Sequence, residues 1–372
     1  MTELRKEISS VFNMTRFLCN SLEHSLEKAF TLEEIHKFKR VVMTGCGDSL
    51  CASMAAKECF EELTGRMVDV PTCINLARHY DARRFGEPGE TLVVLVSFSG
   101  KVSRVVEAAQ RARRLGAVTV GVTHDAASPV AAACDRVLVV QPDEFPLKRT
   151  PGCRTYMAST IALYYLASYM EKSDGKENAV SEMRALIEKN TNDWEAAFPA
   201  IDERLYAAAD AWKNAPYYEF LSAGPEFASA WFGQAKIYEA AGIFSRYENL
   251  EDWAHVDYIL HGMDASMFIF ASPENASYSR AQEVESVLRR QHYKYLFVTE
   301  KADEKIDAAS TLLIPKADKV WLYPLYQTLV PCTYGDHLQQ LKGTSYFCCD
   351  MIETYFPFGG SILRTSEINA SF

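Results

Sequence analysis

Hydrophobic and polar positions along the chain follow two different periods. Leu18, Leu22 and Leu26 recur every four residues among polar neighbours, which predicts helix within residues 1–37. Residues 91–96 instead form an unbroken run, TLVVLV, typical of a parallel strand that is covered on both faces. Short apolar runs of this second kind recur along the chain, and several are followed by a turn of small residues and a helical pattern. The sequence therefore predicts repeated strand–turn–helix units.

The expected elements fall into two similar series, separated by a polar helical stretch at 173–215. In the first series the expected strands are 40–44, 67–70, 91–96, 117–122 and 136–140, and the expected helices are 50–65, 102–115 and 156–169. In the second series the expected strands are 218–222, 266–271, 295–299, 311–314 and 320–322, and the expected helices are 226–241, 279–290, 324–341 and 345–355. The shared order predicts an internal duplication: an α/β protein with two doubly wound parallel sheets. We place the domains at 1–195 and 196–355, followed by a C-terminal tail at 356–372.

Charge and composition narrow the class of protein. The chain has 39 basic and 49 acidic residues, a formal charge of −10, which argues against binding of nucleic acid or an anionic membrane. Its first residues do not form a signal peptide, and no stretch of about 18 apolar residues is present. The ten cysteines include no C-x-x-C pair and mostly have small or apolar neighbours, which predicts reduced thiols. We therefore expect a cytoplasmic protein.

Two turns of the first series carry candidate chemistry. They are Gly45-Cys46-Gly47-Asp48-Ser49 and Ser97-Phe98-Ser99-Gly100, and each follows a strand and precedes a helix. Ligands of doubly wound sheets bind at such turns, and the N–H groups of a helix start favour an anion. A serine there is also a common N-cap, but two such turns, with a third pair of hydroxyls at Ser159 and Thr160, favour a phosphate ligand. Neither a Walker motif nor a complete Rossmann fingerprint is present.

These segments, with Tyr156-Met157-Ala158-Ser159-Thr160, resemble the landmarks of a sugar isomerase (SIS) domain. The resemblance covers the whole chain as a tandem pair, similar to the isomerase half of glucosamine-6-phosphate synthase and to the fructosamine-6-phosphate deglycases. It implies two flavodoxin-like domains and a sugar phosphate held by Ser49, Ser97, Ser99 and the backbone N–H of Phe98. Further residues of the implied site are Cys46, Gly47, Asp48, Gly100, Val102, Ser103 and Ser159.

The sequence departs from the family pattern at several positions. Val102 stands where the family usually has threonine, and Ser103 replaces that hydroxyl only if the helix start is shifted. Arg154 and Ile161 stand where the family often has Glu and Lys. These departures, and the absence of a glutaminase domain, argue against glucosamine-6-phosphate synthase itself. We therefore expect chemistry that does not take ammonia from glutamine.

The second series has no phosphate turn of this kind, because Ser272-Pro273-Glu274-Asn275 lacks the glycine and the second serine. It has Lys236 and Glu239, three residues apart on one helix face, which on spacing alone fits a surface ion pair. The resemblance implies other roles: Glu239 as the general base between C1 and C2 of the sugar, Lys236 as a helper at the sugar oxygen, and His255 as the acid/base of ring opening. Asp252 is a candidate to orient His255, or is solvated.

The resemblance has further implications for the tail and for assembly. Relatives fold the C-terminal segment over the substrate, and Arg364 is the nearest candidate for their basic tail residue; a frayed terminus is the alternative. A homodimer with a shared active site is implied, in which His255 reaches the other subunit. We expect neither a metal nor an organic cofactor, and interpret His79, His124 and His292 as ordinary surface or loop histidines.

The leading hypothesis is an enzyme acting on an amino-sugar or ketosamine 6-phosphate by proton transfer between C1 and C2. Loss of an amine, as in a deglycase or deaminase, is preferred to simple aldose–ketose isomerisation. One alternative is a non-catalytic regulator that senses a sugar phosphate. The spacing of Lys236, Glu239 and His255 and the lack of a helix-turn-helix before residue 40 disfavour it. A dinucleotide-binding domain is the third option, and the incomplete glycine pattern weakens it.

Overall fold

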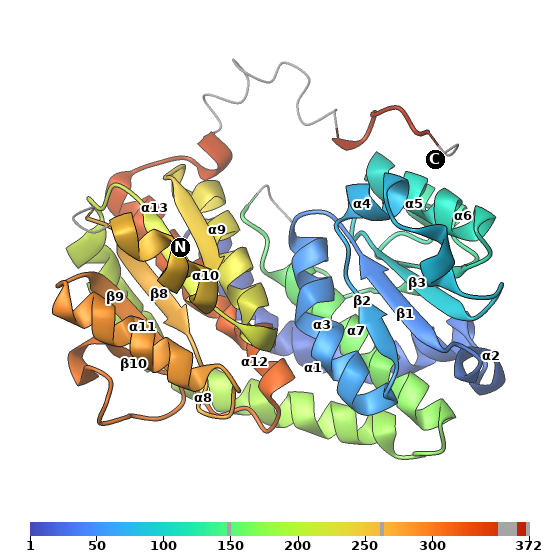
Figure 1. Cartoon of the computed structure of the whole chain (residues 1–372), viewed down its shortest axis with the longest axis horizontal. Helices are drawn as coiled ribbons and strands as arrows, with labels where there is room; N and C mark the ends of the chain where they lie inside the picture. Colours follow the sequence, from blue (N-terminus) through green and yellow to red (C-terminus); the bar gives the residue numbers. More distant parts are fainter. Residues whose placement is uncertain (147–149, 261–263, 349–362, 370–372) are drawn as a thin grey trace. The chain divides into compact units, whose positions relative to one another are not determined.

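The computed structural model describes residues 1–146, 150–260, 264–348 and 363–369. It contains two five-stranded parallel sheets, and the chain divides into two compact units with one sheet in each (Figure 1). The first-sheet unit comprises residues 13–145, 154–188 and 356–372; the second-sheet unit comprises residues 1–12, 146–153 and 189–355. The expected α/β class with two doubly wound parallel sheets is confirmed. The domain boundaries at 195 and 355 stay a prediction.

The first sheet has the strand order β2-β1-β3-β4-β5, with all neighbours parallel. This is the flavodoxin-like order, in which the chain turns back beside its first strand. The elements up to the end of this unit's sheet and its covering helix are α1 (Glu3–Ala29), α2 (Leu32–His36), β1 (Arg40–Thr44), α3 (Asp48–Thr64), β2 (Met67–Asp69), α4 (Cys73–Arg78), η1 (Ala82–Phe85), β3 (Thr91–Val96), α5 (Ser103–Arg114), β4 (Val118–Thr123), α6 (Pro129–Ala133), β5 (Arg136–Val139) and α7 (Arg154–Ser173).

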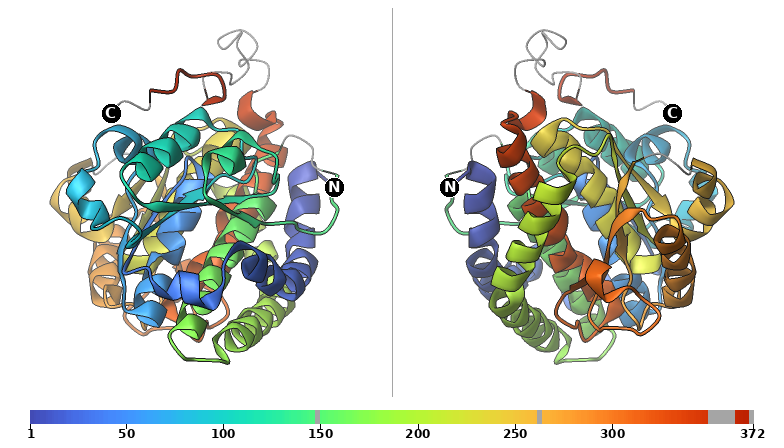
Figure 2. Two further views of the ribbon diagram at one scale, coloured as in Figure 1. Left: turned by 90° about the vertical axis from the view of Figure 1, so that its right-hand side faces the viewer. Right: turned by 90° about the vertical axis from the view of Figure 1, so that its left-hand side faces the viewer.

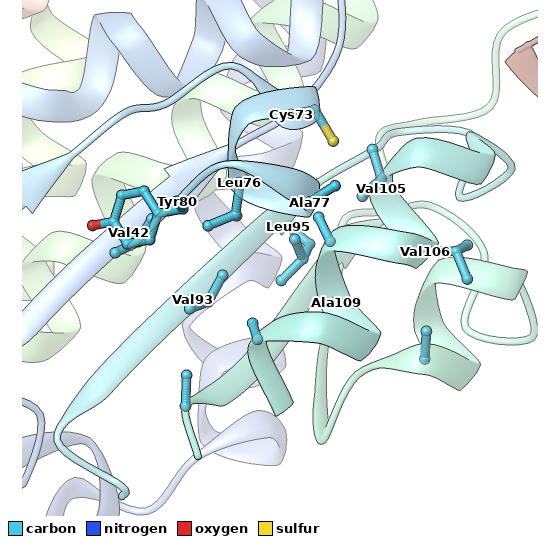
Figure 3. Packing of buried hydrophobic residues seen from close by; sticks show 14 of the residues in the cluster. Val42, Cys73, Leu76, Ala77, Tyr80, Val93, Leu95, Val105, Val106 and Ala109 are labelled. Carbon is cyan, nitrogen blue, oxygen red and sulfur yellow. The ribbon is translucent and has the colours of Figure 1, made fainter. Parts of the chain in front are cut away.

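Both faces of the first sheet are covered by helices (Figures 1 and 2). On one face, Val93 and Leu95 of β3 pack with residues of α4 and α5, including Leu76 and Val105 (Figure 3). On the other face, α3 and α7 pack against each other and against the strands. Because β3 is buried along its whole length, its apolar run is explained by cover on both sides.

The second sheet has the order β10-β9-β8-β6-β7, again all parallel. Numbered from its own first strand, this is the same 2-1-3-4-5 order as the first sheet, so the duplicated order of strands is confirmed. Its elements are α8 (Ala179–Trp212), β6 (Tyr218–Ser222), η2 (Gly224–Glu226), α9 (Phe227–Ala241), β7 (Ser245–Asn249), α10 (Leu250–His255), η3 (Asp257–Leu260), β8 (Ser266–Phe270), α11 (Tyr278–Arg290), β9 (Lys294–Thr299), η4 (Ala308–Ser310), β10 (Thr311–Leu313), η5 (Val320–Leu322), α12 (Tyr323–Gln327), α13 (Leu329–Lys342) and η6 (Tyr346–Cys348).

Two predictions about the second series were wrong. The strand expected at 320–322 is a 3₁₀ turn, η5, that leads into α12; Pro324 near the start of α12 has no N–H to donate to a sheet and favours a helix start. Instead β7, which was not expected, supplies the edge strand beside β6. The helix expected at 324–341 is divided at Thr328 into α12 and α13. Of the helix expected at 345–355, residues 349–355 lie outside the described residues.

The core of the second-sheet unit is rich in aromatic rings on one face of its sheet. Phe220 of β6 stacks on Phe268 of β8 with ring centroids 4.9 Å apart. Tyr334 of α13 and Trp212 of α8 meet Phe268 edge-on from the covering helices. The opposite face packs Leu221, Ile269 and Phe297 with residues of α10 and α11, including Trp253 and Leu288. This unit therefore buries its sheet on both sides, as the first does.

The first strands of the two sheets correspond in register. Thr44 of β1 pairs with Leu95 of β3, and Leu221 holds the same place at the junction of β6 and β8. Three residues further on, each chain has a glycine with positive φ, Gly47 at +58° and Gly224 at +64°. We therefore treat residue 44 as equivalent to residue 221, and number the following turns from there.

The third strands correspond in the same way. The backbone N–H of Ser97 donates to β4 at 3.0 Å, and that of Ala271 donates to β9 at 3.2 Å, each directly after its strand ends. Ser97 is thus equivalent to Ala271, and Phe98 is equivalent to Ser272. The same turns can therefore be compared residue by residue in the two units.

Candidate functional site

The two candidate turns of the first-sheet unit lie against each other at the carboxyl ends of β1 and β3. A Cβ at Gly45 would come within 2.7 Å of the backbone carbon of Ser49 and 2.8 Å of the carbonyl oxygen of Val96. Contacts this short are not found for real side chains, so only glycine fits between the two turns. The absence of a side chain at Gly45 lets the start of α3 approach the end of β3.

The first turn places the start of α3 at this junction. Gly47 is the N-cap residue, and no side chain caps the helix there. Asp48 and Ser49 follow as the first helical residues and are both half-buried. The 17-residue α3 thus directs its first N–H groups and its positive dipole end toward the second turn. Cys46 is half-buried, and a hydrogen bond with the Cys73 thiol lowers its pKa.

The second turn contains a buried hydroxyl without a partner. Ser97 is 2% exposed, and its Oγ has no hydrogen-bond partner among the described residues. A buried hydroxyl normally finds one, because leaving it unpaired costs about 1–3 kcal/mol. Ser99 differs: it is exposed, and its Oγ accepts from the backbone N–H of Lys101 at 3.4 Å. The predicted hydroxyls are both in the turn, and Ser97 is the one that lacks a protein partner.

Gly100 is fixed at the end of this turn by conformation and by space. Its φ is +64°, and a Cβ there would overlap Ser128 Oγ and approach Thr123 Oγ1 to 2.8 Å. Thr123 Oγ1 also donates to the carbonyl of Phe98 at 3.2 Å, and the ring of Phe98 stacks on His124 with centroids 5.5 Å apart. Thr123, His124 and Ser128 therefore shape the turn. The sequence pointed to none of them, and His124 had been set aside as an ordinary loop histidine.

Helix α5 begins at Ser103, one residue after the expected start. Val102 is its N-cap residue and makes no side-chain capping bond, as an apolar side chain cannot. Ser103 is buried at the first helical position. Replacement of the missing threonine hydroxyl by Ser103 stays a prediction.

Ser159 lies within α7, and its hydroxyl donates to the carbonyl of Thr155 at 2.8 Å. Thr160 donates to Tyr156 in the same way at 3.0 Å. Both protons are thus used inside the helix, and only the oxygen lone pairs remain for a ligand. Arg154, where relatives often have Glu, is buried, donates to Asp143 Oδ1 at 2.6 Å and lies 4.4 Å from the centroid of the Phe145 ring.

Lys236 and Glu239 form a close ion pair on α9 of the second-sheet unit. Lys236 Nζ lies 2.5 Å from Glu239 Oε2 and donates to the carbonyl of Gly152 at 3.2 Å. The lysine side chain is fully buried, whereas that of Glu239 is 29% exposed. A pair of this kind is not the surface ion pair that spacing alone suggested. A buried ammonium needs such partners, because its desolvation is costly.

The close packing of α9 explains how a lysine becomes buried there. A Cβ at Gly233 would meet the ring of Phe220 at 2.5 Å, so α9 rests directly on β6. On the other side of α9, a Cβ at Gly335 of α13 would lie 3.1 Å from the Cβ of Ala240. Two glycines, one in α9 and one in α13, thus bring the backbones close, and Lys236 Nζ lies over the ring of Phe232, 4.6 Å from its centroid.

His255 is the last residue of α10 and is exposed, with 70% of its side chain accessible. Its Nε2 lies 3.0 Å from Glu251 Oε1, one helical turn earlier, and Glu251 also binds Arg280 at 2.7 Å. Of the two alternatives for Asp252, orienting His255 or lying in solvent, the structure fits the second, because Asp252 is exposed and His255 pairs with Glu251. Asp252 instead accepts from the side chain of Asn249, the N-cap of α10, which leaves Glu251 on the face of the histidine.

The C-terminal tail is described over residues 363–369. Arg364 is exposed, and the backbone N–H of Asn369 donates to Glu107 Oε2 at 3.1 Å. Glu107 is fully buried on α5 and also binds Arg78 at 2.8 Å and Arg104. This end of the tail thus lies on the first-sheet unit beside α5. The segment from Phe358 to Ile362 lies outside the described residues.

Over the described ranges no cluster of three or more His, Cys, Asp or Glu side chains is arranged to hold a metal ion. The described cysteines form no disulfide with one another. None of the helices that the structure describes is both long and apolar enough to cross a membrane.

Strand order and turn geometry define the class: an α/β protein with two doubly wound, flavodoxin-like sheets. Residues 34–169 match the SIS domain family, and this part of the chain is a SIS domain, as the resemblance implied.

Known proteins share this fold over most of the chain. Over 348 residues this chain is 21% identical to glutamine–fructose-6-phosphate aminotransferase of Legionella pneumophila, and the match covers 91% of this chain and 56% of that protein. The C-terminal domain of the Francisella tularensis aminotransferase superposes with a TM-score of 0.78 at 15% identity, over 92% of this chain and 97% of that one. Tagatose-6-phosphate ketose/aldose isomerase of Escherichia coli gives 0.71 at 14%, over 93% and 95%. The chain thus spans about half the length of the curated relatives it matches.

Proposed function

We propose that the chain is a sugar-phosphate enzyme that moves a proton between C1 and C2 of an amino-sugar or ketosamine 6-phosphate. The observation that carries the proposal is the Ser97 hydroxyl, which is buried at a helix-start turn and has no hydrogen-bond partner among the described residues. A phosphate oxygen would accept its proton. Turns that place N–H groups and hydroxyls at helix starts bind phosphate in many α/β proteins, and the named relatives act on sugar phosphates.

In the proposed phosphate site, Ser97, Ser99, Ser49 and the N–H of Phe98 bind the phosphate oxygens. The start of α3 adds the positive end of its dipole. Asp48 is an acceptor only and would repel a phosphate at close range, so its role is to bind a sugar hydroxyl. Ser103 takes the place of the family's threonine at the start of α5.

In the proposed chemistry, Glu239 acts on the carbon-bound proton. In a ketosamine phosphate, its partly exposed carboxylate removes a proton from C1, and the enolamine is protonated at C2 to give an imine at C1, which water hydrolyses to an aldose phosphate and the amine. In an amino-sugar phosphate, the carboxylate removes the proton from C2, and the enolamine is protonated at C1 to give an imine at C2, which water hydrolyses to a ketose phosphate and ammonia. Lys236, held beside Glu239 at 2.5 Å, stabilises negative charge on the sugar oxygen. A positioned carboxylate of this kind contributes roughly 10²–10⁴-fold to a rate.

His255 is proposed to serve the active site of a second copy of the chain. It is exposed and pairs with Glu251 rather than with Glu239. The residues that follow it, Val256 and Ile259, are large apolar side chains that are 63% and 60% exposed. Exposed apolar residues next to a candidate functional residue favour a surface covered by another subunit. A sedimentation experiment that finds a fully active monomer would refute the proposed dimer and would leave the proposed proton transfer by Glu239 unaffected.

Turnover by a Glu239→Gln variant tests the proposed function. Wild type is expected to release glucose 6-phosphate from a fructosamine 6-phosphate, or fructose 6-phosphate from glucosamine 6-phosphate, and the variant is expected to lose at least about 100-fold in kcat while it still binds substrate. Glu203→Gln, at an exposed position on α8, is the matched control and should keep full activity. Substrate binding without turnover in wild type would instead favour a sugar-phosphate regulator, and no binding at all would refute both.

A further inference from the structure

The carboxylate of Glu226 occupies a closed pocket of donors in the second-sheet unit. Glu226 is fully buried. Its Oε2 accepts from the backbone N–H of Ser272 at 3.0 Å, from the Ser272 hydroxyl at 3.1 Å and from Asn275 Nδ2 at 2.8 Å. Its Oε1 accepts from Gln327 Nε2 at 2.6 Å. Four donors therefore converge on one side chain.

Neighbouring groups fix the direction of these hydrogen bonds. Ser229 donates its hydroxyl to Gln327 Oε1 at 2.7 Å, which matches an amide that turns its nitrogen toward Glu226. Asn275 Nδ2 also donates to the carbonyl of Ala223 at 2.9 Å, which identifies that atom as the nitrogen. The hydrogen-bond partners described for Glu226 all donate to it, and an ionised carboxylate, which only accepts, satisfies all of them. Burial raises the pKa of Glu226, and the hydrogen bonds from Ser272, Asn275 and Gln327 oppose that rise.

The position of Glu226 in the fold gives this cluster its meaning. Counted from the equivalent ends of β1 and β6, Glu226 stands where the first-sheet unit has Ser49. Counted from the ends of β3 and β8, Ser272 stands where the first-sheet unit has Phe98. The backbone N–H of Ser272 that donates to Glu226 is therefore the counterpart of the Phe98 N–H in the first-sheet unit. The Glu226 carboxylate lies between the turns that follow β6 and β8, which correspond to the two turns of the first-sheet unit.

We propose that the second-sheet unit has kept an anion-binding turn, and that Glu226 fills it as a built-in ligand. The class of ligand that the turn accepts is a small oxyanion, a carboxylate or a phosphate oxygen. Because the site is closed by the chain's own side chain, an external anion has access only to the corresponding turn of the first-sheet unit. Glu226 thus determines which of two similar turns binds a ligand from solution.

Removing the built-in ligand should open the site to an external one. In Glu226→Ala four donors lose their acceptor, and the truncated side chain leaves room for formate. We expect the thermal midpoint of this variant to fall well below wild type and to rise with formate concentration, as for any ligand that binds only the folded state. Sodium chloride at equal ionic strength should not raise it. A midpoint that responds to formate no more than to chloride would overturn the proposal.

Two further variants separate the anion site from a general loss of packing. Glu226→Gln keeps the size of the side chain, so formate has no space to enter the second-sheet turn, and formate should stabilise this variant no more than it stabilises wild type. Glu226→Ser reproduces the residue of the first turn, so inorganic phosphate and formate should each stabilise it more than they stabilise wild type, in which only the first-sheet turn is open. None of these readouts requires catalytic turnover, so their failure is distinguishable from failure of the proposed enzyme.

An infrared measurement keeps the proposal falsifiable if Glu226→Ala does not fold. The difference spectrum between wild type and Glu226→Gln near neutral pH should contain the bands of an ionised carboxylate. Bands of a protonated carboxylic acid in their place would contradict a built-in anion, because the O–H of a protonated Glu226 would point at one of the four donors.

Discussion

The two sheets of this protein use one turn geometry in two ways. In the first-sheet unit the turns after β1 and β3 carry Ser49 and a buried Ser97 hydroxyl that has no partner among the described residues. In the second-sheet unit the turns after β6 and β8 carry Glu226 and Ser272, joined by two hydrogen bonds. The first pair of turns is thus left with unused hydrogen-bonding capacity, whereas the second uses its capacity internally.

The difference teaches that a duplicated fold can lose a ligand site without losing its geometry. Strand order, register and the positive-φ glycines at Gly47 and Gly224 are the same in both units. What changes is the side chain two residues after each glycine, serine in one and glutamate in the other. The buried pair of Lys236 and Glu239 lies on α9, in the unit whose turn is closed. In the proposed function, phosphate binding and proton transfer therefore belong to different halves of the chain.

The two units differ in how closely their two turns approach each other at Gly45 and at its counterpart Ser222. The hydroxyl of Ser222 donates to the carbonyl of Phe270 at 2.7 Å, whereas a Cβ at Gly45 would lie 2.8 Å from the carbonyl of Val96. Gly45→Ala should therefore lower the free energy of unfolding by about 3 kcal/mol, since neither backbone contact can give way. Urea denaturation measures this loss.

Ser222→Gly is the matched change in the second-sheet unit. It removes one buried hydrogen bond and no steric conflict, so a loss of about 1 kcal/mol is expected. An equal loss in Gly45→Ala and Ser222→Gly would contradict the closer approach of the turns in the first-sheet unit.

A buried carboxylate within the second sheet offers a second contrast. Glu219 of β6 holds the place of Val42 in β1 and is buried beside Arg246, whose Nε lies 3.1 Å from Glu219 Oε1. Burial raises the pKa of Glu219 to about 7, and Arg246 opposes this while Asp257 and Glu248 add to it. A folded pKa above the unfolded value means that the stabilising contribution of the protonated group is complete below about pH 4.5 and is lost as pH rises through about 7.

Glu219→Gln should remove that pH dependence. Between about pH 5 and pH 8 the unfolding free energy of wild type should fall relative to the variant by on the order of 2–3 kcal/mol. Urea denaturation at several pH values gives the difference, with Glu203→Gln as a control that should run parallel to wild type. Parallel curves for Glu219→Gln and wild type would show that Glu219 is ionised throughout.

Most of the fold could be predicted from the sequence because the strands that form the two sheet centres are apolar runs. Residues 40–44, 91–96 and 218–222 were predicted with the bounds that the structure has. The edge strand β7 was missed because its sequence, SRYEN, is polar and only partly buried. The serines of the first turns were found from their position before helices. That Ser97 alone is buried without a partner depends on the fold around it.

Glu226 could not be identified from the sequence, because Gly224-Pro225-Glu226 is an ordinary helix start. Its donors Ser272 and Gln327 lie 46 and 101 residues away, and only the sheet brings them together. The burial of Lys236 was likewise hidden, since it depends on glycines in α9 and α13. Asp252 was a candidate partner of His255, but the start of α10 at Leu250 places Glu251 one helical turn before it instead.

The most direct test of the two uses of one turn compares Ser97→Ala with Ser272→Ala in the presence and absence of inorganic phosphate. The Ser97 hydroxyl has no partner in the part of the chain that the structure describes, so the unfolding free energy of its variant should lie within about 0.5 kcal/mol of wild type, and the variant should lose most of the stabilisation by phosphate. Ser272 binds Glu226, so its variant should lose about 1 kcal/mol and keep the full phosphate effect. The opposite pattern, with phosphate binding lost in Ser272→Ala and kept in Ser97→Ala, would contradict the account.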